Sequence, residues 1–160
     1  MSTRCQTGFE GGDVLVYRHS DGYPTSQLPL LSRFVNTFMK SRGFDSEYMA
    51  ARLCAAIARV WGTVGPEGQS KSQSKSEYKY GEFLSLGVDT KFHDDIEWFY
   101  FVKKNGDIEV YAASMWDHSG RPYTGRAPSA GARLVGTLTA NSSVAVAKKA
   151  AEKAEADDRA

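Results

Sequence analysis

The dipeptide Asn105-Gly106 separates two runs of β-branched and aromatic residues, and this pattern constrains the fold more than any other in the sequence. Asn-Gly is the preferred pair for a type I′ turn between antiparallel strands. A two-residue loop fixes the register, and it predicts that Phe101 faces Val110 and Phe99 faces Ala112. The two faces of the hairpin then carry Phe99, Phe101, Ile108 and Val110 on one side, and Trp98, Tyr100, Val102, Glu109 and Tyr111 on the other. The second face is too aromatic for a wet surface, so we expect a helix, the C-terminal segment or a partner to cover it.

Four further segments have the composition of strands. Residues 3–9 and 14–17 flank the turn Glu10-Gly11-Gly12-Asp13, and they predict a second antiparallel hairpin. Residues 78–88 predict another strand, and residues 134–139 predict a short last one.

Two amphipathic helices are predicted between these strands. After Pro24, apolar residues recur with the period of a helix as far as Gly43, and Thr25 and Ser26 are suitable N-caps. Asp45 is the predicted N-cap of a second helix, which the next glycines end. The sequence therefore predicts an α+β fold, with an antiparallel sheet of about four to six strands and two helices packed on one face.

Residues 1–140 are predicted to form a single α+β domain, which suits a chain of 160 residues. Within this domain, residues 65–77 carry no large apolar side chain and predict a mobile loop. Residues 141–160 are rich in Ala, Lys, Glu and Asp and have almost no apolar stripe. We expect them to be a solvated charged tail, either disordered or helical.

Charge and cysteine content limit the class of protein. The formal net charge is +1, which argues against a general electrostatic hold on nucleic acid or acidic lipid. The two cysteines, Cys5 and Cys54, belong to no paired motif, and the chain starts without the apolar stretch of a signal peptide. No run of residues is apolar enough for a membrane span. We therefore expect a cytoplasmic protein with no membrane partner.

The segment Tyr17-Arg18-His19-Ser20-Asp21-Gly22-Tyr23-Pro24 is the strongest candidate for a site. Asp21 and Gly22 suit a turn from strand to helix, because Asp accepts hydrogen bonds from turn N–H groups and Gly takes positive φ. Beyond the turn, the free N–H groups of a helix start favour an anion, such as a nucleotide phosphate. The candidate ligand-binding residues are Arg18, His19, Asp21 and Tyr23. The alternative is a turn with a purely structural role.

Each of the three histidines has a carboxylate within two positions, which can fix the tautomer of its ring. If the strand that ends at His19 and the turn that holds His93 lie at the same end of the sheet, they form one cluster. The candidate catalytic residues are His19, Asp21 and His93. No metal-binding or nucleotide-binding motif is present, so we expect neither a metal nor a cofactor.

Trp98, Tyr100 and Tyr111 suggest a different kind of site, a stacking platform for RNA or single-stranded DNA on a sheet face. Carboxylates nearby, among them Glu97 and Glu109, repel phosphate. A covered core face is the preferred interpretation, and we do not expect nucleic acid to be the partner.

The opening Met1-Ser2-Thr3-Arg4 and the segment from Tyr17 to Pro24 resemble a group of small proteins of bacteriophages and prokaryotic genomes. These proteins begin M-[SA]-T-R and carry Y-x-H-x-D-G-Y-P before a helix, and their later aromatic hairpin is also similar. The resemblance covers roughly residues 1–112 through short motifs and leaves out the tail. It implies a phage-like setting in the cytoplasm of a host cell, but no mechanism, since the group has no established activity.

Three hypotheses of function follow. The first is a non-enzymatic accessory or host-modulating protein that binds a protein partner or a small anionic ligand through the turn from His19 to Pro24. The second is a small enzyme acting on a nucleotide-type substrate, with His19 and Asp21 supported by His93. The third is RNA or single-strand binding on the aromatic face. The sequence leaves the oligomeric state open.

Overall fold

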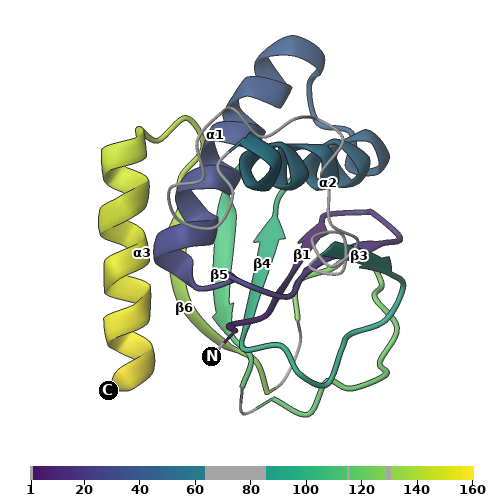
Figure 1. Ribbon diagram of the computed structural model, residues 1–160, viewed down its shortest axis with the longest axis vertical. Coiled ribbons are helices and arrows are strands. Elements are labelled where there is room, and N and C mark those ends of the chain that lie inside the picture. Colours follow the sequence, from purple (N-terminus) through teal and green to yellow (C-terminus); the bar gives the residue numbers. More distant parts are fainter. Residues whose placement is uncertain (1, 64–85, 115, 129–130) are drawn as a thin grey trace.

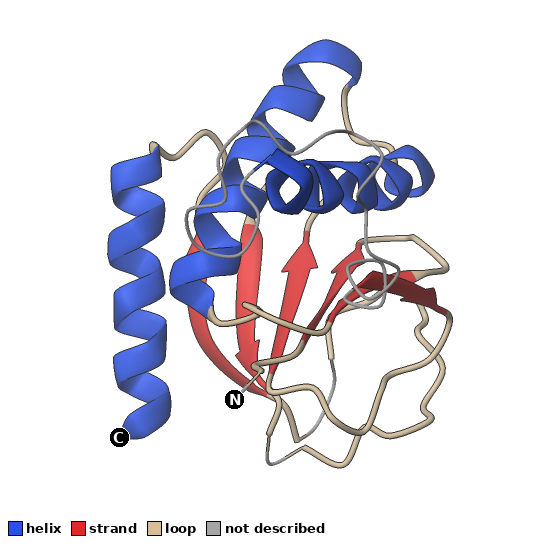
Figure 2. Cartoon of the chain, in the orientation of Figure 1, coloured by secondary structure: helices blue, strands red, loops and turns tan. Residues whose placement is uncertain are grey.

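A six-stranded sheet with helices on one face forms the protein, and the predicted α+β class is confirmed (Figures 1 and 2). The computed structural model describes residues 2–63, 86–114, 116–128 and 131–160, and the predicted loop at residues 65–77 lies outside them. The strands are β1 Cys5–Phe9, β2 Leu15–Arg18, β3 Leu86–Asp89, β4 Trp98–Val102, β5 Ile108–Ala112 and β6 Arg133–Leu138. The helices are α1 Pro24–Arg42, α2 Ser46–Thr63 and α3 Val144–Arg159.

The strands lie in the order β3-β2-β1-β4-β5-β6, and one pair is parallel. Strands β1 and β4 run in the same direction, whereas the other four pairs are antiparallel, as predicted. A parallel pair needs a long connection between its strands, and here α1 and α2 lie in that connection. The sheet is therefore mixed rather than purely antiparallel.

The hairpin of β4 and β5 has a register one residue away from the predicted one. The N–H of Lys103 donates to the Asp107 carbonyl oxygen, and the N–H of Gly106 donates to Lys103, so the loop has three residues. Gly106 is left-handed, with a φ of 92°. Phe101 consequently faces Glu109 and Phe99 faces Tyr111. Because a shift of one residue exchanges the two faces of a strand, the predicted faces of β5 are wrong relative to β4.

Two buried clusters fill the two sides of the sheet. On the helix side, Trp98, Tyr100 and Val102 of β4 pack with Ile108 and Val110 of β5 and with apolar residues of all three helices. The aromatic face is thus covered by helices, one of the predicted covers (Figure 1). The other side holds a largely aromatic cluster, in which residues of β2, β4 and β5 meet loop residues: Leu15, Tyr17, Phe92, Phe99, Phe101, Tyr111, Trp116 and Tyr123.

The C-terminal helix α3 lies against α1 and β6 rather than standing in solvent (Figure 1). Ala147 and Ala151 are fully buried, and Ala154 is 1% exposed. Asn36 of α1 holds the loop before α3 in place. Its side-chain amide donates to the Ser142 carbonyl oxygen and accepts from the N–H of Asn141. A helix was one of the two predicted alternatives for residues 141–160. The prediction that this segment is solvated is wrong for the face of α3 that is buried. Alanine lets the helix approach closely without a stripe of large apolar residues.

His118 is buried, and neither of its ring nitrogens meets the hydrogen-bond criteria with any described residue, which predicts a dependence of stability on pH. Burial next to Trp116 and Phe92 lowers the pKa of His118 below its usual 6.5. The unfolded chain therefore takes up the proton first, so the free energy of unfolding is expected to fall as pH drops below about 6.5. The slope contributed by one histidine is at most about 1.4 kcal/mol per pH unit.

Urea unfolding at several pH values measures this effect. His118→Phe removes the titrating group and is expected to flatten the dependence of stability on pH below about pH 6.5. An unchanged slope in this variant contradicts the assignment to His118.

Candidate functional site

The turn from His19 to Pro24 is held by β1 and β4. Asp21 takes the left-handed conformation, with a φ of 58°, whereas we had assigned positive φ to Gly22. The N–H of Gly22 donates to Thr3, and its carbonyl oxygen accepts from the Tyr100 hydroxyl at 2.8 Å. A Cβ at Gly22 would lie 2.8 Å from the backbone nitrogen of Cys5. Glycine is thus required here for close approach to β1, which is a structural reason for part of the motif.

The start of α1 is not a free anion site, contrary to the sequence prediction. Tyr23 is the N-cap and makes no side-chain capping bond, so neither Thr25 nor Ser26 has the predicted capping role. The N–H of Thr25 donates to a carboxylate oxygen of Glu155 in α3, at 2.7 Å. A carboxylate is the group that a helix N-terminus favours. The chain itself supplies the anion.

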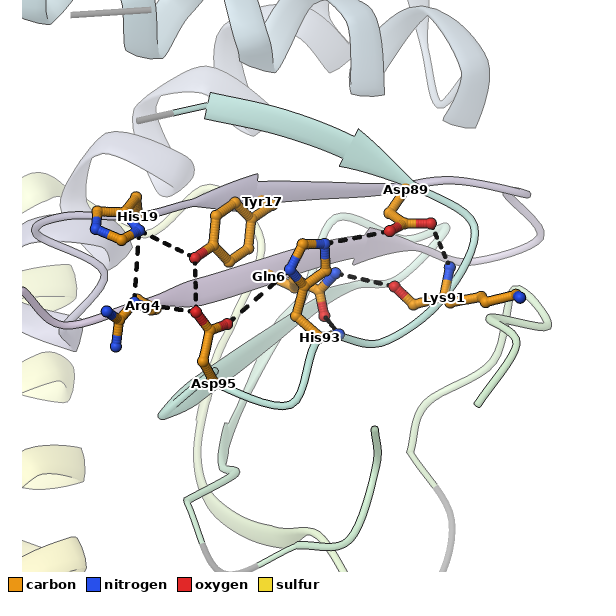
Figure 3. A network of polar contacts seen from close by, with 8 residues as sticks. All are labelled: Arg4, Gln6, Tyr17, His19, Asp89, Lys91, His93 and Asp95. Carbon is orange, nitrogen blue, oxygen red and sulfur yellow. Dashed lines mark hydrogen bonds and ion pairs between the residues drawn. The ribbon is translucent and has the colours of Figure 1, made fainter. Parts of the chain in front are cut away.

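A network of polar side chains, which we name the polar cluster, lies beside this turn and consists of Arg4, Tyr17, His19, Asp89, His93 and Asp95 (Figure 3). The Tyr17 hydroxyl donates to Oδ2 of Asp95 at 3.1 Å and lies 3.2 Å from Nδ1 of His19. Nε of Arg4 lies 3.1 Å from the same Asp95 oxygen and 3.4 Å from Nδ1 of His19. Burial first, and then Asp95, raises the pKa of Tyr17 to about 12, so the phenol stays protonated and donates.

His93 belongs to the same cluster. Its ring stacks on Tyr17 at 4.3 Å between centroids, with Nε2 3.2 Å from Asp89 and Nδ1 4.0 Å from Asp95. Desolvation raises the pKa of Asp89, but the N–H groups of Lys91 and Thr90 and the His93 ring outweigh it and lower that pKa. The structure thus brings His19 and His93 into one cluster through Tyr17 and Asp95.

Sequence reasoning missed Arg4 and Tyr17 as members of this cluster. Tyr17 and His19 are two residues apart, and side chains two apart in a strand point to the same face. This alternation could have indicated that Tyr17 lies beside His19. Cys5 pairs with Arg18, which places Arg4 next to His19 in the same hairpin. The described contacts give Asp21 no part in the cluster.

The cluster does not present His19 as a general base. Arg4 can only donate, and the Tyr17 proton goes to Asp95, so Nδ1 of His19 acts as an acceptor. A general base is oriented by a carboxylate, and none of the described carboxylates contacts the His19 ring. Within the described residues, no group of three or more His, Cys, Asp and Glu side chains could hold a metal ion.

A groove of about 1060 Å³ is lined mainly by α1 and α2, with Arg18 of β2 and two residues of α3 completing its lining. Its cationic lining residues are Arg18, Arg33, Arg42, Arg52 and Lys148. The described residues that line it include no carboxylate. Sequence reasoning missed this groove, because its cations come from one strand and three helices and are far apart along the chain.

Arg18 is the buried cation of this groove. It is 4% exposed, and one of its terminal nitrogens donates to the Gln27 side chain at 2.7 Å. Its Nε is buried and has no hydrogen-bond partner within the described part of the chain. Among the ion pairs of the described residues, none includes Arg18. A buried charge normally has a counter-charge, and among the described residues Arg18 has no acidic partner.

The predicted stacking platform is not exposed. Trp98, Tyr100 and Tyr111 are 6%, 0% and 7% exposed, and Tyr111 lies on the opposite side of the sheet from the other two. Nucleic acid could reach these rings only if the helices and loops moved away.

No family model matches the chain, and no curated protein or solved structure matches it either. None of the helices in the described part of the chain is long and apolar enough to cross a membrane. The resemblance to small phage proteins stays a prediction. Function therefore has to be inferred from the polar cluster, the turn and the groove.

Proposed function

We propose that the chain is a non-enzymatic accessory protein that binds an anionic partner in the groove between α1 and α2. Arg18, one of the residues singled out in the sequence, is among the residues that line this groove. In the phage-like setting that the sequence motifs imply, the partner is a component of the host cytoplasm. The observation that carries the proposal is the lining, which has five cations and, among the described residues, no carboxylate; of the five, only Arg42 has an ion pair among the described residues, with Asp45 at 3.8 Å.

The charge of the groove contrasts with that of the whole chain. The net charge is only +1, whereas the groove lining holds five cations, of which Arg18 is buried and Arg42 pairs with Asp45 at 3.8 Å. Arg33, Arg52 and Lys148 make none of the ion pairs found among the described residues. Their charges are thus available to a partner, and they steer an anionic one toward the groove.

Binding of a polyanion tests this proposal. A fluorescent poly-glutamate peptide is expected to bind the wild-type chain and to bind the double variant Arg33→Glu with Arg52→Glu at least about tenfold more weakly, or roughly 1.4 kcal/mol. The matched control is Arg121→Glu with Arg126→Glu, because both of these arginines are exposed and lie outside the groove lining. Fluorescence anisotropy at low salt measures the affinity.

Two outcomes contradict the proposal. Equal weakening by the two double variants would mean a diffuse effect of net charge rather than binding in the groove. Weakening by His19→Ala with Asp21→Ala, and not by the groove variant, would place the site at the turn.

The enzyme alternative is supported by the placement of His19 and His93 in one cluster. We do not adopt it, because Nδ1 of His19 accepts a hydrogen bond from Arg4 and the ring is not oriented as a base.

A further inference from the structure

We infer that the occupant of the groove is an acidic amphipathic helix of a protein partner. This inference rests on the proposed function, because it names the chemistry of the anionic partner at the same groove. It follows from the length of the groove, its apolar floor and the spacing of its cations.

The groove has the length of a helix of several turns. It runs beside α1 from Ser26 to Arg42, a separation of 16 residues and thus about 24 Å along the axis. A partner helix of about 16 residues has the same length. A small ligand would fill only part of this space.

The floor of the groove is an apolar stripe. Leu30, Phe34 and Phe38 follow one another at intervals of four residues on α1, so they lie on one face of it. Ala55 and Ala56 of α2 face the same groove, and their small side chains leave room for a neighbour. An apolar floor of this kind accepts the leucines or phenylalanines of an amphipathic helix.

The cations are spread along the groove rather than gathered at one point. Arg33 and Arg42 are nine residues apart on α1, about 13 Å along its axis. Arg52 projects from α2, and Lys148 from α3. One phosphate group cannot reach all of these side chains, but several carboxylates on one helix can. The spacing therefore favours glutamates and aspartates over a single phosphate.

The aromatic residues of the groove do not suit nucleic acid. The guanidinium of Arg42 lies 3.7 Å from the centre of the Tyr48 ring and covers its face. Phe34 and Phe38 are partly buried against the core, and their rings are tilted to each other by 40°. Base stacking needs open ring faces, so a polypeptide is the better fit.

Selection of peptides on the whole chain tests the inference. A displayed library of random peptides of about 16 residues is selected for binding to the wild-type protein. The peptide that binds most tightly is then synthesised. We expect enrichment of leucine or phenylalanine at helical spacing with flanking Glu or Asp. Replacing the acidic residues of the peptide by Gln is expected to weaken binding at least about tenfold.

A steric variant tests the position without changing the charge. Ala55 and Ala51 are both exposed on α2, but only Ala55 lines the groove. Ala55→Trp is expected to weaken peptide binding at least about tenfold, whereas Ala51→Trp leaves it within about twofold. Circular dichroism and unfolding of both variants verify that they fold.

The inference is overturned if the enriched peptides lack acidic residues, if no peptide is enriched, or if Ala55→Trp binds as tightly as Ala51→Trp. Tighter binding of a single-stranded DNA than of any selected peptide, lost in Ala55→Trp, overturns it in favour of nucleic acid. If poly-glutamate binding depends on Arg33 and Arg52 in these cases, the proposed function stands and only the helical partner is excluded.

Discussion

Gly22→Ala is expected to destabilise the folded protein by about 3 kcal/mol, the upper range for overpacking a tight site. A Cβ at this position would lie 2.8 Å from the backbone nitrogen of Cys5 and 2.9 Å from the carbonyl carbon of Arg4. These are backbone atoms of β1 and its approach, so no side-chain rotation relieves the contact. Either the turn or the start of β1 has to move.

The hydrogen bonds of Gly22 make such a movement costly. Its N–H donates to Thr3, and its carbonyl oxygen accepts from the fully buried Tyr100. Displacement of the turn leaves the Tyr100 hydroxyl without this acceptor, and a buried unpaired polar group costs about 1–3 kcal/mol. The same displacement moves Arg18 and His19, which precede the turn.

Gly87→Ala is the matched control, since it makes the same chemical change on β3 of the same sheet. A Cβ there would meet Tyr17 at 3.7 Å, an ordinary contact distance. Glycine within a strand is itself unfavourable by roughly 0.5–1 kcal/mol, so this variant is expected to be neutral or slightly stabilised. Urea unfolding compares the two, and equal free energies of unfolding would contradict the account of Gly22.

The sequence predicted the helices and strands better than the register and the pairing of the strands. The hairpin at Asn105-Gly106 was predicted, but its register was not, because Asn and Gly also suit a three-residue loop with a left-handed glycine. The parallel pairing of β1 with β4 joins strands 93 residues apart, from Cys5 to Trp98. No local pattern encodes a pairing at that separation.

The candidate site shows the same limit. The sequence offered both Asp21 and His93 as partners of His19, and it could not decide between them. The fold joins His19 to His93 through Tyr17 and Asp95. The cations of the groove were visible in the sequence only as solvent-facing residues of separate helices. Arg18 was singled out for its place in the turn. That it is buried against Gln27 of α1, with no acidic partner among the described residues, follows only from the packing of the helix on the sheet.

Ala151→Glu is expected to release α3 from the domain, at a cost of about 3 kcal/mol or more in the free energy of unfolding. Ala151 is fully buried where α3 meets α1 and β6, so a carboxylate there would be taken out of water without a partner. Removing the pairing or the hydration of a buried charge costs about 3–5 kcal/mol. The matched control is Ala156→Glu, an exposed position of the same helix, which is expected to be nearly neutral.

Limited trypsin digestion distinguishes release of the helix from global unfolding. Lys148, Lys149 and Lys153 lie in α3, and cleavage after them is expected to accelerate in Ala151→Glu while the remaining domain resists. Release also removes Glu155 from Thr25 and Lys148 from the groove wall. Peptide affinity should then fall less than in Arg33→Glu with Arg52→Glu, because those two cations stay in place. Cleavage throughout the chain at the same rate would instead mean that α3 unfolds together with the rest of the domain. An unaltered digestion pattern would mean that the buried alanines of α3 are not what holds the helix in place.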